Sequence, residues 1–160
     1  MKRLALLPVI VAVSLAAPPA QADTCTTVSG KFNEVIMSKD AAPNDPADRV
    51  IGTVDGSLAG ATTAFITSLT PARDGGFQVS TINAFATLEG NLLLAKGSAS
   101  WTFISNGFYQ VDLALTITGG AGKYGNATGT INVLGVGNNV GPGTGQFLHD
   151  YRGTVCTPGS

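Results

Sequence analysis

Residues Val111–Gly129 read Val-Asp-Leu-Ala-Leu-Thr-Ile-Thr-Gly-Gly-Ala-Gly-Lys-Tyr-Gly-Asn-Ala-Thr-Gly, and the predicted fold follows from this stretch. Its first part places an apolar side chain at every second position up to Ile117, which is typical of a half-buried β-strand. The glycine-rich segment 119–122 predicts a turn, because glycine adopts positive φ at little cost. Alternation resumes with Ile131 and Val133, so the stretch predicts two strands joined by a glycine corner.

The same alternation recurs along the rest of the chain. It predicts further strands at residues 26–39, 49–59, 61–70, 77–88, 92–104 and 146–156. Ser105-Asn106-Gly107 is a strong hairpin signal. Residues 40–48, with two prolines, and the glycine-rich residues 135–145 are predicted to be loops. No segment has a convincing amphipathic helical pattern, and residues 122–127 form at most one helical turn.

Two cysteines, Cys25 and Cys156, lie near the two ends of the chain that follows the N-terminal segment. In a secreted protein an even pair of this kind predicts a disulfide, which would place the first strand near the last. About eight strands with joined ends favour an all-β fold, a closed antiparallel eight-stranded β-barrel with one terminal disulfide, because closure removes exposed sheet edges. A β-sandwich is the alternative from the same pattern.

The N-terminal segment 1–22 has the features of a secretory signal peptide. Lys2 and Arg3 precede an apolar run, and Ala20-Gln21-Ala22 fits a cleavage site with small residues. The alternative is a retained membrane anchor. We therefore expect one domain over residues 23–160, secreted to the extracellular space or the periplasm and not held in a membrane after cleavage.

Charge narrows the range of partners. Without Lys2 and Arg3 the chain has seven basic and ten acidic residues, a net charge of −3. A basic patch is what nucleic acids and anionic membranes require, so we expect no nucleic acid partner. Two cysteines and one histidine are too few soft ligands for a zinc site. The sequence predicts no metal and no cofactor.

The segment Gly119-Gly120-Ala121-Gly122-Lys123-Tyr124-Gly125-Asn126-Ala127-Thr128-Gly129 resembles the glycine signature of the allene oxide cyclase and dirigent barrel superfamily. Gly52-Thr53-Val54-Asp55-Gly56 and Tyr151-Arg152-Gly153 are similar to that family's wider plan. Ala121 departs from it, because threonine is usual there. The resemblance implies an eight-stranded barrel whose lumen holds an apolar ligand, and it makes a homotrimer one of the expected states beside a monomer or another homo-oligomer. The motif shapes a corner, so it indicates fold more than function.

Four ionisable side chains share the apolar faces of the predicted strands: Glu34, Tyr109, His149 and Tyr151. A carboxyl group or an imidazole on an apolar wall is suited to acid–base chemistry, which makes Glu34 and His149 the catalytic candidates. Tyr109, Tyr151 and Trp101 are the ligand-binding candidates. Each also has a structural interpretation: a lone histidine is more often a hydrogen-bonded core residue, Glu34 can lie in water at a barrel end, and aromatic residues pack with a polar tip at the rim.

Two functional hypotheses remain from the sequence. In the first, the barrel binds a small, mainly apolar molecule in its lumen, with cofactor-free cyclase or isomerase activity as an extension. This hypothesis requires an open lumen of about 300 Å³ or more, with at least two of the four ionisable side chains converging in it. In the second, the protein is a non-catalytic extracellular module that acts through its outer face. The sequence leaves open whether the protein is an enzyme.

Overall fold

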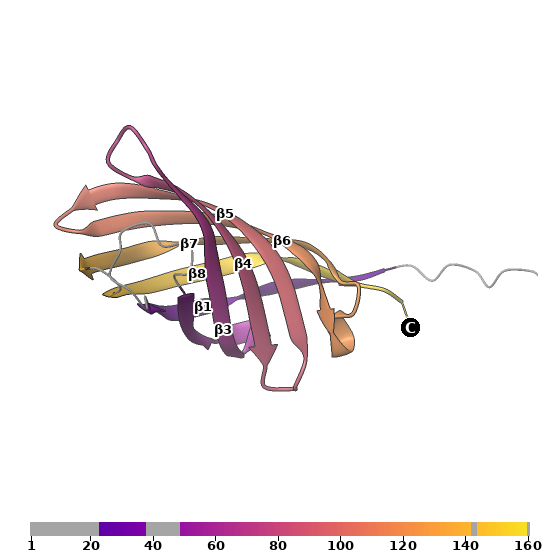
Figure 1. Cartoon of the computed structure of the whole chain (residues 1–160). Helices are drawn as coiled ribbons and strands as arrows, with labels where there is room; N and C mark the ends of the chain where they lie inside the picture. Colours follow the sequence, from indigo (N-terminus) through magenta and orange to yellow (C-terminus); the bar gives the residue numbers. More distant parts are fainter. Residues whose placement is uncertain (1–22, 38–48, 142–143, 160) are drawn as a thin grey trace, which may run out of the picture.

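The structure is a computed structural model that describes residues 23–37, 49–141 and 144–159. Figure 1 shows its elements, which are β1 (Thr24–Met37), β2 (Arg49–Val54), η1 (Gly56–Leu58), β3 (Gly60–Pro71), β4 (Phe77–Thr87), β5 (Leu92–Ser105), β6 (Phe108–Ala121), η2 (Gly122–Tyr124), β7 (Thr128–Gly141) and β8 (Thr144–Thr157). Each strand pairs with its chain neighbour, and β8 pairs with β1 to close the barrel. This confirms the predicted closed antiparallel eight-stranded barrel. The predicted signal peptide and the loop at 40–48 lie outside the described residues.

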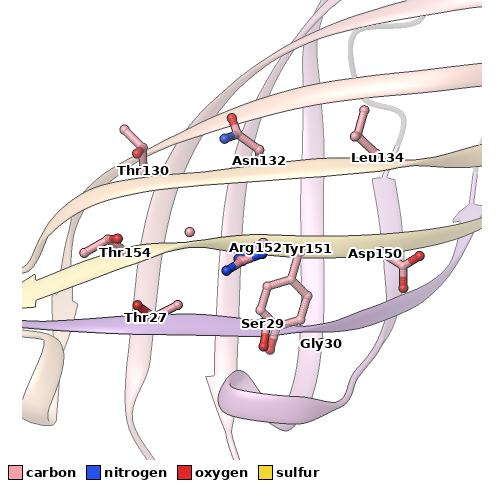
Figure 2. A pocket seen from close by; sticks show the side chains of 11 residues that line it. Thr27, Ser29, Gly30, Thr130, Asn132, Leu134, Asp150, Tyr151, Arg152 and Thr154 are labelled. Atoms are coloured by element: carbon pink, nitrogen blue, oxygen red, sulfur yellow. The ribbon is translucent and has the colours of Figure 1, made fainter.

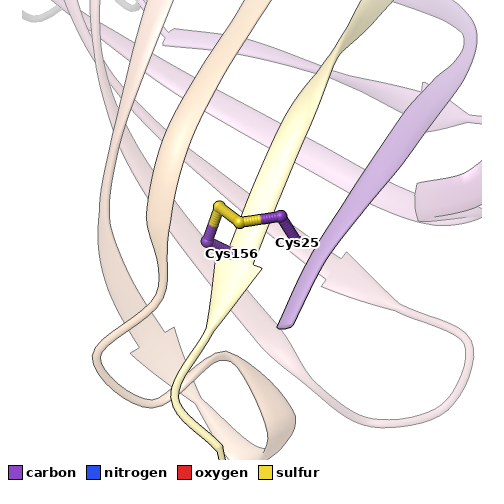
Figure 3. The surroundings of a disulfide bond; sticks show 2 residues. All are labelled: Cys25 and Cys156. Carbon is purple, nitrogen blue, oxygen red and sulfur yellow. A yellow bond between two sulfur atoms is a disulfide. The ribbon is translucent and has the colours of Figure 1, made fainter. Parts of the chain in front are cut away.

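The seam between β1 and β8 holds the barrel closed. Its register runs from Thr24 opposite Thr157 to Met37 opposite Thr144 without a shift. Cys25 lies opposite Cys156 in this ladder, and the two form a disulfide with an S–S distance of 2.07 Å (Figure 3). The predicted disulfide is therefore confirmed, and it is consistent with an oxidising compartment.

The two ends of the barrel differ. The helix end, as we name it, carries η1, η2 and the turn at residues 88–91, and the hairpin end carries the turns at 72–76 and 106–107 (Figure 1). Leu58 of η1 and Tyr124 of η2 are buried, so side chains fill the helix end. The hairpin at 106–107 forms as predicted, with Asn106 at φ 49° and Gly107 at φ 80°.

The predicted strand at 49–59 is wrong beyond Val54, where β2 ends. Gly56 adopts φ 75°, which an extended strand cannot continue, and η1 begins there. A side-chain oxygen of Asp55 accepts a hydrogen bond from the backbone N–H of Lys31 at 2.6 Å, which ties this bend to β1. The chain therefore crosses the barrel end and places Leu58, 0% exposed, in the core.

The predicted glycine-rich loop at 135–145 is also wrong, because β7 continues to Gly141 and β8 begins at Thr144. Gly135 lies opposite His149 and Gly137 lies opposite Phe147. A Cβ at Gly137 would collide with the Phe147 ring, and one at Gly135 would collide with a backbone carbonyl and with the His149 ring. Glycine is required at these positions of β7 because the rings of His149 and Phe147 on β8 occupy the space that a side chain would fill.

Within the described residues, no helix is long and apolar enough to cross a membrane.

Replacing Cys25 with serine is expected to lower the melting temperature by roughly 5–15 °C under oxidising conditions. The disulfide joins residues 131 positions apart, so it restricts the unfolded chain strongly. Scanning calorimetry measures the shift, and reduction of the unmodified protein should reproduce it. An unchanged melting temperature in the variant would show that this bond does not stabilise the barrel.

Replacing Gly135 with alanine is expected to lower the free energy of unfolding by about 1–3 kcal/mol, because the new Cβ overlaps the carbonyl of Leu148. Gly125→Ala is the matched control. Its Cβ would lie 3.5 Å from the nearest atom, an ordinary contact, so the change should stay within about 0.5 kcal/mol. Urea unfolding measures both variants, and equal midpoints would contradict the proposed packing role of Gly135.

Candidate functional site

The described residues enclose a small cavity of about 40 Å³ in the lumen, between the helix end and the hairpin end. Its apolar wall includes Val50, Ile66, Ala99, Val111 and Phe147. This volume is far below the open lumen of about 300 Å³ that the binding hypothesis requires, as far as the described part of the chain shows. The physical reason is geometric: the interior of an eight-stranded barrel is just wide enough for its own side chains to fill it. The remaining space suits a water molecule or the last few atoms of a ligand.

Glu34 of β1 and His149 of β8 face each other across the seam at this cavity. The distance from His149 Nδ1 to Glu34 Oε2 is 3.5 Å, and the side chains are 4% and 10% exposed respectively. Neither ring nitrogen of His149 has a hydrogen-bond partner among the described residues. Two of the four predicted ionisable side chains therefore converge, and both are largely buried.

A second polar pair lines the same cavity from β4. Asn83 is buried, and its side-chain amide donates a hydrogen bond to Thr81 Oγ1 at 2.7 Å. Gly97 of β5 lies opposite Thr81, and a Cβ there would collide with that hydroxyl. The sequence analysis missed this pair, although both residues have the same parity as the buried Phe85 in the predicted strand 77–88.

Thr62 of β3 is a further buried polar group that the sequence analysis missed. It lies opposite Gly52, which in turn lies opposite Glu34. Its hydroxyl has no hydrogen-bond partner among the described residues. The Thr62 hydroxyl oxygen is therefore another buried polar atom in the barrel interior without a partner among the described residues.

An aromatic cluster leads from the cavity to the hairpin end. Trp101 lines the cavity and packs against Phe147, with ring centroids 5.2 Å apart. Beyond it, Phe77 and Tyr109 contact Trp101 at centroid distances of 6.4 Å each. Phe103, 44% exposed, packs on Tyr109 at 5.6 Å. We name Phe77, Trp101, Phe103 and Tyr109 the aromatic rim.

Tyr151 lies apart from this cavity, nearer the helix end. Its hydroxyl donates a hydrogen bond to the carbonyl of Asp55 at 2.8 Å and accepts one from the backbone N–H of Leu58 at 2.9 Å. Its ring stacks on Phe32 at a centroid distance of 4.7 Å. Burial raises the pKa of the Tyr151 hydroxyl above its ordinary value. These contacts connect Tyr151 to the bend that carries η1.

The structure thus divides the predicted site residues into three places. One cavity is lined by Glu34, His149 and Trp101. Tyr109 lies outside this cavity, at the aromatic rim. Tyr151 packs nearer the helix end, where its hydroxyl hydrogen-bonds to Asp55. Within the described residues, no three His, Cys, Asp or Glu side chains are grouped so that they could hold a metal ion.

Known proteins similar to this chain do not identify a ligand or a reaction for this cavity. No protein-family model matches the chain, and no curated protein matches it. The solved structure of a pterocarpan synthase dirigent protein aligns over 92% of this chain and 100% of its own, at 16% sequence identity and a TM-score of 0.35. A likeness at this level assigns neither a family nor a function.

Replacing Tyr151 with phenylalanine is expected to lower the free energy of unfolding by about 1–2 kcal/mol, because a buried N–H and a part-buried carbonyl each lose a partner. The matched control is Tyr109→Phe at the half-buried rim, for which we expect less than about 0.5 kcal/mol. The raised pKa of Tyr151 also makes the stability difference depend on pH. Above about pH 10 the tyrosine of the unfolded chain loses its proton more readily than that of the folded protein, so the unmodified protein loses stability relative to Tyr151→Phe. Urea unfolding at pH 7 and above pH 10 measures both effects, and equal stability of the two proteins at pH 7 would contradict this assignment.

Proposed function

We propose that this protein is a secreted barrel that binds a small, mainly apolar molecule at its hairpin end, with a polar group of the ligand reaching Glu34 and His149. One observation carries the proposal. His149 is 6% exposed, yet both of its ring nitrogens lack a hydrogen-bond partner among the described residues. A buried polar group without a partner costs about 1–3 kcal/mol, and native proteins rarely keep one without a reason. A polar group of a ligand would supply the missing hydrogen bond.

The size of the cavity limits how such a ligand is held. About 40 Å³ accepts only a few atoms, so most of the ligand has to lie against the aromatic rim. The rim offers flat apolar faces, and Phe103 leaves 44% of its surface exposed. A larger ligand enters only if Trp101 moves, because this ring lies between Phe147 of the cavity wall and Tyr109 of the rim.

The chemistry that the cavity supports is proton transfer without a cofactor. Glu34 and His149 lie 3.5 Å apart in the buried wall, so either can exchange a proton with a bound molecule, and Asn83 and Thr81 orient polar groups from the opposite side. Isomerisation or cyclisation of a bound molecule needs only orientation and a few placed polar groups. The catalytic extension of the proposal therefore assigns acid–base roles to Glu34 and His149, with Trp101 and Tyr109 as ligand contacts.

The proposed compartment is the extracellular space or the periplasm. The disulfide at the seam supports it, because such bonds persist mainly in oxidising environments. The proposed assembly is a monomer or a homo-oligomer. Native mass spectrometry of protein purified from its own source tests both ligand and assembly, since it detects a co-purifying small molecule and counts the subunits.

Filling the cavity is expected to abolish ligand binding. Ala99→Val adds two methyl groups to a cavity of about 40 Å³, whereas Ala114→Val adds them to the exposed face of β6. With 4-methylphenol as the probe, the fluorescence of Trp101, the one tryptophan of the chain, should show saturable quenching in the unmodified protein and in Ala114→Val. The quenching should be absent in Ala99→Val.

Thermal melts of both variants verify that the barrel is folded. Equal quenching in Ala99→Val and the unmodified protein would place the probe outside the lumen and contradict the proposal. Absence of quenching in the unmodified protein, together with no co-purifying molecule, would contradict it as well.

A further inference from the structure

A second hollow lies on the outside of the barrel, away from the lumen. It has a volume of about 810 Å³ and runs along β8, with β1 on one side and β7 on the other (Figure 2). Outward side chains line it in register, namely the rows Thr27–Thr154–Thr130 and Ser29–Arg152–Asn132 and the pair Asp150–Leu134. Both rows are entirely polar.

An adjoining hollow of about 510 Å³ extends this surface over β1 and β2, and the two share Asp150. We name the pair the outer trough. From Thr27 to Asn33 on β1 it covers six residue steps, about 20 Å at roughly 3.3 Å per residue. This length suits several units of an extended chain and exceeds what a single small ion requires.

The charged side chains of the outer trough differ in whether they already have a partner within the chain. Lys31 Nζ lies 3.5 Å from Asp150 Oδ1, so these two charges offset each other. The carboxylate of Asp55 accepts a hydrogen bond from the backbone N–H of Lys31 at 2.6 Å. Arg152 lies in the middle row and has no ion pair within the described part of the chain. Ser29 and Asn132 lie directly beside it on the neighbouring strands.

We propose that the outer trough binds an oligosaccharide that carries carboxylate groups. Arg152 pairs with one carboxylate, because a planar guanidinium matches its two oxygens. Ser29, Asn132 and the threonine row hydrogen-bond the sugar hydroxyls. This site is separate from the lumen and does not depend on the function proposed above.

Other partners fit the trough less well. An extended peptide adds to a sheet through an open strand edge, whereas β8 at the centre of the trough is paired on both sides, with β1 and with β7. Nucleic acids need several unpaired cations along a strand, and the trough offers one. An apolar partner would meet mainly hydroxyl, amide and charged groups, because Leu134 and Leu148 are the large outward apolar side chains that line it. A sugar chain with spaced hydroxyls and a carboxylate complements this surface.

Calorimetric titration of the disulfide-bonded protein with a galacturonic acid oligomer tests the proposal. Arg152→Gln should weaken binding by about fivefold or more. The matched control, Arg73→Gln, removes the same charge from the exposed turn at 72–76 and should bind as the unmodified protein does. Asn132→Asp, which places a carboxylate beside Arg152, should also weaken binding.

A neutral galactose oligomer of the same length isolates the contribution of charge and should bind the unmodified protein more weakly than the acidic oligomer. Equal binding of the two oligomers would overturn the role of Arg152. The absence of binding at millimolar concentration, or equal losses in Arg152→Gln and Arg73→Gln, would overturn the site. None of these outcomes depends on a ligand in the lumen.

Discussion

The hydrogen-bonded seam between β1 and β8 is the interaction on which the rest of the structure depends. Every other strand pairs with its neighbour in the chain, but this ladder joins segments more than a hundred residues apart, as the disulfide separation of 131 shows. Closing so long a loop has the largest entropic cost in the fold. The seam also builds both proposed sites: Glu34 and His149 meet on its inner face, while Ser29 and Arg152 lie opposite each other on its outer face. Without closure neither arrangement exists.

Glycine determines where large side chains fit inside so narrow a barrel. Tyr151 lies opposite Gly30, and His149 and Phe147 lie opposite Gly135 and Gly137. In each case the facing strand has no side chain, so a ring can lie across the vacated position. The imidazole is therefore held in place by packing on one side and by the contact with Glu34 on the other. This explains how an eight-stranded barrel encloses polar groups although it has almost no free volume.

Buried polar groups in the lumen lower the stability of the fold, and they bear on the proposed function. Thr62 and His149 bring into the interior of the barrel buried polar atoms that have no hydrogen-bond partner among the described residues. Replacement by hydrophobic side chains of similar size would remove this cost. Tyr151 is a contrasting case, because both hydrogen bonds of its hydroxyl are made within the chain. The Asn83–Thr81 pair is likewise satisfied within the chain, whereas Thr62 and His149 have no partner among the described residues.

The sequence by itself determined most of the strands and the pairing of Cys25 with Cys156, because alternation of period two and an even cysteine count are local or compositional signals. Parity also places Glu34 and His149 on inward faces. Only the tertiary structure decided that they meet 3.5 Å apart and that the lumen is nearly full, because both depend on the register across the seam and on the volumes of side chains from all strands. The misjudged loop at 135–145 has the same cause: glycines there serve rings on β8, and no local pattern reveals a partner on another strand.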